Sequence, residues 1–498
     1  MENPDGLFAG FDVGTQGLKG LLIDARSRRV VARGQVGYGL LPGLAPGAAE
    51  QHPDTWIQAL GEVARQLFGA PGVETARLSG IGISGQQHGL VVLDGEDRPL
   101  RAAKLWCDTQ TAAEARELSV RLGRPVPTGF TAPKVLWLAR HEPETWRRTR
   151  RVLLPHDYVN LVLSGSAWCE AGDASGTGWF DPRTRAVDAD SCAAVAPDLL
   201  QRLPPLAEAG SLPGRLSERG AWVLGLDSRQ VGVPLSTGAG DNMASAIGAG
   251  ATREGVAVLS LGTSATIFAH SSRAVVDPGG LIAAFCDSTG GWLPLLCVMN
   301  ATGALEEVRA LFGASHAELE RLAAELPCDP EGPLCLPFFQ GERVPDLPLA
   351  RAAFVGLGPG SLTRGRLYRA CLEGVALNLA AGVERMRLLG LGCERLFAVG
   401  GGARNRLWLE LVASAAGAEI VPLAEGESAA LGAALQALWS VRRSEGHREA
   451  CGAVAEDWVL PQGEPVLPDA GLAHSLAVLR ARFQAAQAGL YPASSGSG

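Results

Sequence analysis

A carboxylate that follows a glycine-rich run is the residue of this sequence best suited to acid–base chemistry. Asp241 comes directly after Thr237-Gly238-Ala239-Gly240 and opens an alanine-rich segment that predicts a helix. Glycines let a backbone turn sharply and approach a ligand, and a helix N-terminus offers free N–H groups and a partial positive charge. Asp241 is therefore a candidate catalytic base. The alternative is an N-cap, which is a common role for Asp at a helix start and needs no substrate.

A turn that contains glycine and threonine follows the first strand of the chain. Residues 7–12 predict a buried strand and residues 18–24 a returning strand, with Gly14 and Thr15 in the turn between them. Such a turn can direct N–H groups and a hydroxyl at an anion, although short Gly-Thr turns also occur in many sheets without a ligand. Asp12, which ends the first strand, is suited to holding Mg²⁺ through water.

The same strand–turn–strand order recurs in the second half of the chain. Residues 256–260 and 265–269 predict the two strands, and Gly262 and Thr263 lie in the turn between them. Aligning the two turns places a serine where the first copy has its aspartate. We interpret the recurrence as an internal duplication of a domain. Two such turns could hold a phosphate chain from both sides.

A third candidate ligand loop contains three consecutive glycines. It joins a strand predicted at 396–399 to a helix predicted at 406–413, and it includes Gly401, Gly402 and Asn405. Three successive glycines are costly in conformational entropy, which favours a loop that brings its backbone against a ligand. Asn405 could cap the following helix or bond a nucleotide.

Polar side chains for an acceptor molecule follow another predicted buried strand, in the segment 80–89. Gln87 and His88 lie where that strand ends. Side chains at the carboxyl end of such a strand tend to face a ligand crevice. Both residues can donate and accept hydrogen bonds, which suits a polyhydroxylated molecule. A histidine in a turn can equally be an exposed residue without a ligand.

The composition predicts a large globular protein of two domains. The chain has 498 residues, 47% hydrophobic and 19% charged, which is too long for one ordinary core. We place an N-terminal domain at 1–247, a C-terminal domain at 248–490 and a disordered tail at 491–498, with a ligand cleft between the domains. The Pro- and Gly-rich stretch 183–234 predicts a peripheral elaboration of the first domain.

The charge and the cysteines exclude several classes of protein. The net charge of 44 − 52 = −8 lacks the basic excess of nucleic-acid-binding proteins. Ten cysteines without a Cys-x-x-Cys pair are typical of buried thiols in a reduced compartment. The acidic N-terminus fits no secretory or transit peptide, and no apolar run is long enough for a membrane span. We expect a cytoplasmic protein.

Five further segments complete a pattern that resembles the FGGY family of carbohydrate kinases, and within it the members that act on xylulose. The resemblance runs along most of the chain. The segments are Glu50–Trp56, Leu105–Asp108, Gly129–His141, Leu153–Tyr158 and Leu336–Pro345. Any one of them is a weak signal, whereas together they are specific.

The resemblance implies an α/β fold of two ribonuclease H-like domains of the actin and hexokinase superfamily. It also implies phosphorylation of D-xylulose to D-xylulose 5-phosphate by ATP and Mg²⁺, with Asp241 as the general base and Asp12 near the metal. On the same basis the sugar contacts are Gln87, His88, Asn242, Asp241 and Trp106. The nucleotide contacts are Gly14, Thr15, Lys19, Gly262, Thr263, Gly401, Gly402 and Asn405. Homodimerisation is common in relatives.

Two departures and two rival functions accompany this prediction. The second family signature departs from the expected residues at Arg366 and Cys371, although its helix pattern survives. Gln87 stands where the members that act on xylulose show either Met or Gln, so the pocket chemistry alone does not fix the sugar. Another sugar or polyol, such as ribulose, glycerol or gluconate, is the nearest rival substrate. A non-catalytic sugar or ATP sensor on the same fold is the rival from another class. The presence of both Asp12 and Asp241 argues against the sensor, which needs neither magnesium chemistry nor a base.

Overall fold

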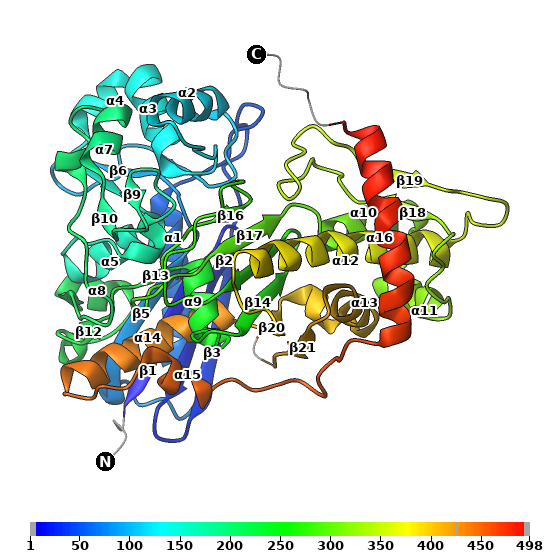
Figure 1. Ribbon diagram of the computed structural model, residues 1–498. Helices are drawn as coiled ribbons and strands as arrows, with labels where there is room; N and C mark the ends of the chain where they lie inside the picture. The colour runs from blue at the N-terminus through cyan, green and yellow to red at the C-terminus, as the bar shows by residue number, and fades with distance from the viewer. Residues whose placement is uncertain (1–5, 425, 493–498) are drawn as a thin grey trace.

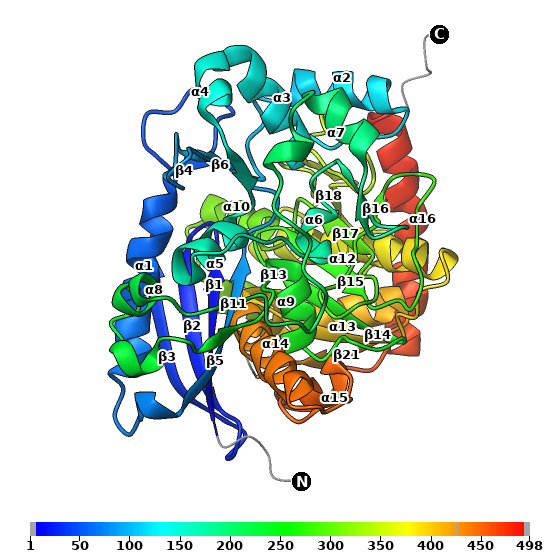
Figure 2. The ribbon, with the colours of Figure 1, turned by 90° about the vertical axis from the view of Figure 1, so that its left-hand side faces the viewer.

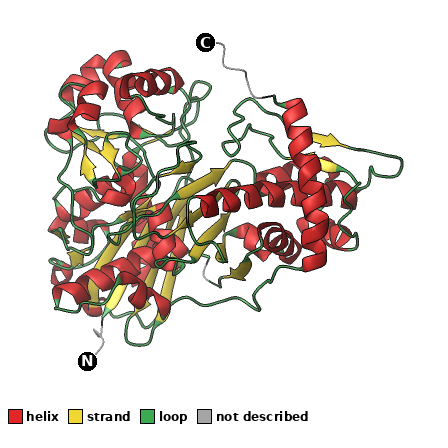
Figure 3. Ribbon diagram, viewed as in Figure 1, coloured by secondary structure: helices red, strands yellow, loops and turns green. Residues whose placement is uncertain are grey.

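The computed structural model describes residues 6–424 and 426–492, which form two α/β lobes (Figure 1). Each lobe is built on one sheet, with helices on both sides of the strands (Figure 3). The first sheet has the strand order β11-β12-β5-β1-β2-β3, with β13 also paired to β5. Its strands are β1 (Leu7–Val13), β2 (Gly17–Asp24), β3 (Arg29–Gly37), β5 (Leu78–Gly85), β11 (Gly214–Arg215), β12 (Pro234–Leu235) and β13 (Ala239–Gly240).

The second sheet repeats the arrangement of the first. Its order is β16-β17-β15-β14-β20-β21. In each sheet an antiparallel hairpin (β1–β2 or β14–β15) is followed by a strand (β5 or β20) that runs parallel to the first strand of the hairpin. The predicted hairpins and their duplication are therefore confirmed. The strands are β14 (Val256–Leu261), β15 (Ala265–Ala269), β16 (Ile282–Ala283), β17 (Leu295–Val298), β20 (Arg395–Val399) and β21 (Glu419–Pro422).

Helices and short two-stranded ribbons surround the sheets. The helices of the first lobe are α1 (Pro53–Phe68), α2 (Ala112–Leu122), α3 (Thr131–His141), α4 (Pro143–Arg148), α5 (Pro155–Ser164), α6 (Ala171–Ala174), α7 (Ala189–Val195), α8 (Glu218–Val223) and α9 (Asp241–Gly248). Those that follow are α10 (Thr302–Phe312), α11 (His316–Ala324), α12 (Arg364–Leu388), α13 (Arg406–Ala416), α14 (Ser428–Ser444), α15 (Cys451–Glu456) and α16 (Ala470–Leu490). The ribbons are β4 (Glu50–Gln51) with β7 (Ala103–Lys104), β6 (Val91–Leu93) with β8 (Arg151–Leu153), β9 (Phe180–Asp181) with β10 (Ala186–Val187), and β18 (Leu334–Leu336) with β19 (Ala353–Val355).

Alternation along β1 decides which way Asp12 faces. Leu7, Ala9 and Phe11 belong to the core under α1, whereas Phe8 packs in a second core against α14. Figure 2 shows α1 and α14 on opposite sides of the first sheet. Because side chains on a strand alternate between its two faces, Asp12 shares the face of Phe8. Asp12 is thereby directed to the side of the sheet where α9 and α14 lie.

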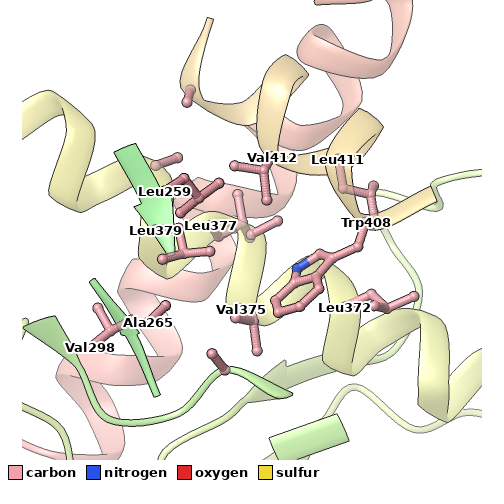
Figure 4. Close-up of a cluster of buried hydrophobic side chains, with 14 of the residues drawn as sticks. Leu259, Ala265, Val298, Leu372, Val375, Leu377, Leu379, Trp408, Leu411 and Val412 are labelled. Atoms are coloured by element: carbon pink, nitrogen blue, oxygen red, sulfur yellow. The ribbon is translucent and has the colours of Figure 1, made fainter. Parts of the chain in front are cut away.

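The same alternation in β14 builds the core of the second lobe. Ala257 and Leu259 face the large cluster under α12 and α13, and Val258 faces the α9 side. Figure 4 shows Leu259 in this cluster, with Trp408 of α13 beside Val375 of α12 (Figure 4). Since α9 contributes to cores against both sheets, its first residue, Asp241, starts between the lobes.

Helix α14 comes from the second half of the chain yet packs on the sheet of the first lobe. The fit needs glycines. A Cβ on Gly10 would lie 2.0 Å from the Ala430 carbonyl oxygen, and a Cβ on Gly248 would lie 2.0 Å from the Ser428 carbonyl oxygen. The backbones of β1, α14 and α9 therefore lie closer together than any side chain would permit, which fixes α9 relative to Asp12.

The stretch 183–234 and the C-terminal residues differ in how far the structure tests what was expected of them. The stretch 183–234 is only partly peripheral, because β11 and β12 join the edge of the first sheet. Two-residue strands carry no period that a sequence pattern can show. Of the tail expected at 491–498, Tyr491 packs 5.9 Å from the Phe338 ring, and 493–498 lie outside the described residues. Within the described part, no helix is long and apolar enough to cross a membrane.

Candidate active site

Asp241 is the first residue of α9 and does not cap it. The N-cap is Gly240, whose backbone is extended (φ −62°, ψ 152°) and which has no side chain to bond. The N-cap alternative for Asp241 is therefore wrong. Its Oδ1 accepts hydrogen bonds from the Asn242 backbone N–H at 2.8 Å and from Asn242 Nδ2 at 2.9 Å. In the described chain Oδ2 accepts no hydrogen bond, so one carboxylate oxygen is held and the other is available.

The surroundings of Asp241 make it a stronger base than an ordinary aspartate. Burial raises its pKa to about 8, and the negative charges of Asp12 and Asp173 add to the rise. The two hydrogen bonds from Asn242 oppose it without cancelling it. A carboxylate of raised pKa is tuned for proton transfer near neutral pH, so the site favours acceptance of a proton at Asp241.

Asn242 links Gln87 to Asp241 by hydrogen bonds. Asn242 Nδ2 donates to Gln87 Oε1 at 2.8 Å as well as to Asp241. Thr266 of the second sheet donates to Asn242 Oδ1 at 3.3 Å. Gly240 is needed here, because a Cβ on it would lie 2.8 Å from Gln87 Cγ. The predicted base and two predicted sugar contacts therefore form one connected polar cluster.

Asp12 forms the second acidic position of the site. Ser84 Oγ donates to its Oδ1 at 2.8 Å. Burial raises the pKa of Asp12, and the Ser84 hydrogen bond and Lys19 oppose that rise. Lys19 is the cross-strand neighbour of Asp12 and forms an ion pair with Glu427 at 2.9 Å. Lys19 thus lies near the acidic position, and its role as a phosphate contact stays a prediction.

The side chains around Asp12 suit magnesium, and they do not suit a metal ion that needs several protein ligands. Among the residues that the structure describes, no group of three or more His, Cys, Asp or Glu could hold a metal ion. Mg²⁺ in phosphoryl-transfer sites keeps several waters and needs only one or two carboxylates plus phosphate oxygens. A single partly buried carboxylate at Asp12 meets that requirement.

The turn of the first hairpin is tied to surrounding side chains. Thr15 Oγ1 accepts from Trp106 Nε1 at 3.0 Å and donates to Gln86 Oε1 at 3.0 Å. Gln51 Nε2 donates to the Thr15 carbonyl at 2.7 Å, and Tyr38 OH donates to the Gly14 carbonyl at 2.8 Å. Trp106, predicted as a sugar contact, thus lies against a residue predicted as a nucleotide contact.

The glycine turns of the second lobe form a separate group. Gly262, Thr263 and Gly401 are exposed, and a Cβ on Gly401 would meet nothing within 4 Å. Gly402 is buried, and a Cβ there would lie 2.6 Å from Trp408 and 2.8 Å from Leu261, which places the glycine loop next to the end of β14. Asn405 Oδ1 accepts from the Trp408 N–H at 2.9 Å, so the first of its two predicted roles, the helix cap, is confirmed.

His88 is held in an unusual position. Its φ is +64°, in the left-handed region that is uncommon for a residue with a side chain. Its ring contacts Phe130 (5.3 Å between centroids) and Phe285 (5.6 Å), which also contact each other at 6.2 Å. Burial lowers the pKa of His88 to about 4 although Asp173 opposes the shift. The imidazole is therefore neutral at physiological pH, and each ring nitrogen has a fixed role as donor or acceptor.

Sequence reasoning missed two residues of this region. Asp173 lies 3.6 Å from His88 Nδ1, and its charge raises the pKa of Asp241. Arg343 is exposed, and its Nη2 lies 3.9 Å from the position that a Cβ on Gly129 would take. The only sequence signal for Asp173 is an acidic residue within a run of small residues, and Arg343 lies in a segment quoted for its family resemblance without a role of its own.

Comparison with protein families and known proteins agrees with this geometry. The N-terminal domain of the FGGY family of carbohydrate kinases matches residues 7–248, and the C-terminal domain of that family matches residues 257–441. Together the two matches cover both duplicated sheets, although the C-terminal match stops within α14.

Several xylulose kinases are similar to the chain. The xylulose kinase of Haemophilus influenzae is 39% identical over 450 residues, which cover 87% of this chain and 90% of the relative. That of Streptomyces rubiginosus is 38% identical over 446 residues, 86% of this chain and 87% of the relative. A solved kinase structure from Brucella ovis, described as a xyloylose kinase, superposes with a TM-score of 0.89 at 33% identity and covers 97% of this chain and 99% of that one.

Proposed function

The chain belongs to the FGGY family of carbohydrate kinases, and we propose that it transfers the γ-phosphoryl group of ATP to D-xylulose and releases D-xylulose 5-phosphate. Xylulose kinases at 30–39% identity over most of the chain support the choice of sugar. The single observation that carries the chemistry is the half-free carboxylate of Asp241, which is bonded through Asn242 to Gln87.

In the proposed mechanism Asp241 Oδ2 accepts the proton of the terminal primary hydroxyl while that oxygen attacks the γ-phosphorus. Oδ1 is held by Asn242, so the direction of Oδ2 is fixed before the sugar arrives. Phosphoryl transfer has a loose transition state, and alignment of the attacking oxygen contributes most to the rate. Gln87 and His88 would bind hydroxyls of the ketose, because both present groups that donate or accept hydrogen bonds.

The nucleotide is assigned to the glycine turns of both lobes. Gly262, Thr263 and Gly401 offer exposed backbone to a phosphate chain or a nucleoside. Gly14, Thr15 and Lys19 approach it from the first lobe, and Gly402 and Asn405 shape the loop. Mg²⁺ would be held near Asp12 through water, where it neutralises charge on the transferred phosphoryl group.

A sugar panel tests this proposal directly. ADP release is measured with D-xylulose, D-ribulose, glycerol and gluconate at equal concentrations. We expect saturable, sugar-dependent release with D-xylulose and a lower kcat/KM with each of the others. The Asp241→Asn variant, which keeps the shape of the side chain, should lose this activity. Equal kcat/KM for D-ribulose would reject the sugar, and nucleotide binding without any ADP release would favour the sensor.

The assembly and the compartment remain separate proposals. All ten cysteines are free thiols in the structure, which supports a reducing compartment such as the cytoplasm. Homodimerisation rests on the family resemblance alone. The mass of the protein in solution, measured by light scattering, distinguishes the dimer from a monomer of 51.8 kDa.

A further inference from the structure

We infer that Asp173 is a positioning residue that fixes which nitrogen of His88 faces the sugar, by holding the proton of that ring on Nδ1. The inference rests on the proposed function for the identity of the sugar, but not for the geometry of the two side chains. It gives a role in specificity to a carboxylate that no sequence motif singled out.

Asp173 uses its two oxygens on two different histidines. Its Oδ2 lies 2.9 Å from His156 Nδ1, and its Oδ1 lies 3.6 Å from His88 Nδ1. The backbone N–H of His88 donates to the same Oδ1 at 3.4 Å. All three side chains are buried or nearly so, with 12% of His88 exposed and no exposure of Asp173 or His156. Asp173 is therefore fixed from one side and faces His88 with the other.

His156 keeps the orientation of Asp173 from reversing. Asp157 Oδ1 lies 3.1 Å from His156 Nε2, so that a carboxylate faces each nitrogen of this ring. Burial alone would lower the pKa of His156, but Asp157 and Asp173 raise it to about 9. A carboxylate oxygen only accepts hydrogen bonds, so His156 Nδ1 donates to Asp173 Oδ2, whereas His156 Nε2 makes no hydrogen bond in the described chain. Asp173 must therefore present an acceptor oxygen to His156, and its second oxygen is left for His88.

The two nitrogens of the His88 ring have different surroundings: Nδ1 faces Asp173 and Nε2 does not. Nδ1 is buried and makes no hydrogen bond in the described chain, and Asp173 Oδ1 lies 3.6 Å from it. A carboxylate oxygen beside a neutral imidazole favours a proton on the facing nitrogen. Nε2 then carries a lone pair, bonds no residue that the structure describes, and can accept a hydrogen bond from a sugar hydroxyl.

Packing restricts the ring to this position. A Cβ on Gly176 would lie 1.8 Å from His88 Cε1 and 2.1 Å from Nδ1, so the backbone of residue 176 lies against the imidazole edge. Phe130 and Phe285, whose own ring centroids lie 6.2 Å apart, both contact the ring in tilted orientations. A ring held by two aromatic neighbours and along one edge changes the direction of its hydrogen bond most readily by changing its tautomer.

The tautomer of His88 is measured by NMR of the empty, full-length protein labelled with ¹⁵N-histidine, with His88→Gln to assign the signals. We expect Nδ1–H in the wild-type protein. In Asp173→Asn the amide oxygen stays on His156 and the amide NH₂ faces His88, which should move the proton to Nε2. An Nε2–H ring in the wild-type protein, or an unchanged Nδ1–H ring in Asp173→Asn, would overturn the inference. The wild-type measurement stands even if the variant fails to fold.

Kinetics with D-xylulose supply the second readout. When a hydrogen bond from the sugar to His88 is lost, KM in Asp173→Asn is expected to rise about tenfold, because the contact is made equally before and during transfer. On the plateau of the pH profile kcat should change less than about threefold; removing the charge of Asp173 also lowers the pKa of Asp241, which moves the profile itself. Gly176→Ala, which displaces the ring and keeps Asp173, should raise KM similarly. A fall in kcat at constant KM would contradict a positioning role.

Asp157→Asn is the matched control. It alters the same buried cluster on the far side of His156 and does not touch His88. We expect an unchanged His88 tautomer and an unchanged KM, whatever its effect on stability. A wild-type protein that shows Nδ1–H but does not phosphorylate D-xylulose would reject the proposed function while leaving the role of Asp173 intact.

Discussion

The two hairpin turns occupy the same position in two sheets of the same strand order, yet their side chains are bonded differently. In the first turn the Thr15 hydroxyl is fully used, by Trp106 on one side and Gln86 on the other. In the second turn Thr263 is exposed, and its carbonyl accepts from the Ala301 N–H at 3.1 Å. Both turns have backbone hydrogen bonds, but the second has fewer side-chain bonds: Thr302 Oγ1 donates to the Gly262 carbonyl at 2.7 Å, and no residue of the described chain bonds the Thr263 hydroxyl.

The two lobes also differ at the position that is acidic in the first strand of the first sheet. Asp12 in β1 is partly buried and adds to the electrostatic strain on Asp241, while Ser260 has the matching place in β14, opposite Thr266. Duplication thus supplied two equivalent frames for a ligand, and divergence concentrated the acids and the polar network in the first. We therefore propose that the first lobe carries the reaction chemistry and that the second offers an open backbone surface to the nucleotide.

The largest effect is expected at the base. Asp241→Ala should lower kcat by about 10²–10⁴-fold, since a general base contributes on that order, while the protein stays folded. Steady-state ADP release with D-xylulose measures the rate, and thermal unfolding checks the fold. A variant that keeps near-normal kcat would show that the acids of the first lobe do not carry the chemistry.

The two matching positions Asp12 and Ser260 provide the next comparison. Asp12→Ala should raise the Mg²⁺ concentration for half-maximal activity at least about tenfold, because a neutral side chain cannot hold the water shell of the ion. Ser260→Ala should change it less than about twofold. Both are read from the rate against free Mg²⁺ at fixed ATP. Equal responses of the two variants would mean that the lobes do not differ in this way.

Removing each turn hydroxyl separates the lobes by substrate. Thr15→Val breaks the bonds to Trp106 and Gln86, so we expect KM for the sugar to rise about tenfold, the equivalent of one hydrogen bond left unmade at its upper range, together with a rise in KM for ATP from the nucleotide role proposed for Thr15. Thr263→Val should instead raise KM for ATP, by about threefold to tenfold, with KM for the sugar unchanged. The KM values for sugar and ATP of both variants decide the matter: an unchanged KM for the sugar in Thr15→Val, or a raised one in Thr263→Val, would contradict the assignment.

Sequence patterns predicted the elements that repeat, and missed the contacts that depend on distant segments. The hairpins, the helix that begins at Asp241 and the glycine loop before α13 follow from local apolar period and turn residues. The two-lobed fold of the actin and hexokinase superfamily, expected from the resemblance, is confirmed. The domain boundary near 247 stays a prediction, and the packing of α14 on the first sheet was not foreseen.

The residues of the candidate site also divide into those that local motifs predicted and those that depend on contacts between distant segments. Residues inside motifs, such as Asp241, Asn242 and Gln87, were predicted, and their mutual hydrogen bonds bring them together. Asp173 was missed, since its importance comes from lying beside His88, 85 positions earlier in the chain. No period or spacing records such a contact. The assignment of each residue to sugar, nucleotide or metal remains a prediction for the experiments above.

The last prediction concerns the pH dependence of thermal stability. It compares Asp241, a buried acid near other acids, with the neutral Ser260. The folded-state pKa of Asp241 is about 8, above its ordinary value of 3.8, so folding favours the protonated form. The stability that this group contributes is present at low pH and is lost as pH rises from near 4 through about 8.

The Asp241→Asn variant cannot ionise and therefore avoids that loss of stability. Its Tm should equal that of the wild type near pH 4 and exceed it by a margin that grows as pH rises to 8.5, each kcal/mol of lost stability corresponding to roughly 2–4 °C in a domain of this size. Ser260→Ala should show no such pH-dependent difference. A constant difference between Asp241→Asn and the wild type across this range would show that the carboxylate is not strained, and that the two lobes differ in hydrogen bonding alone.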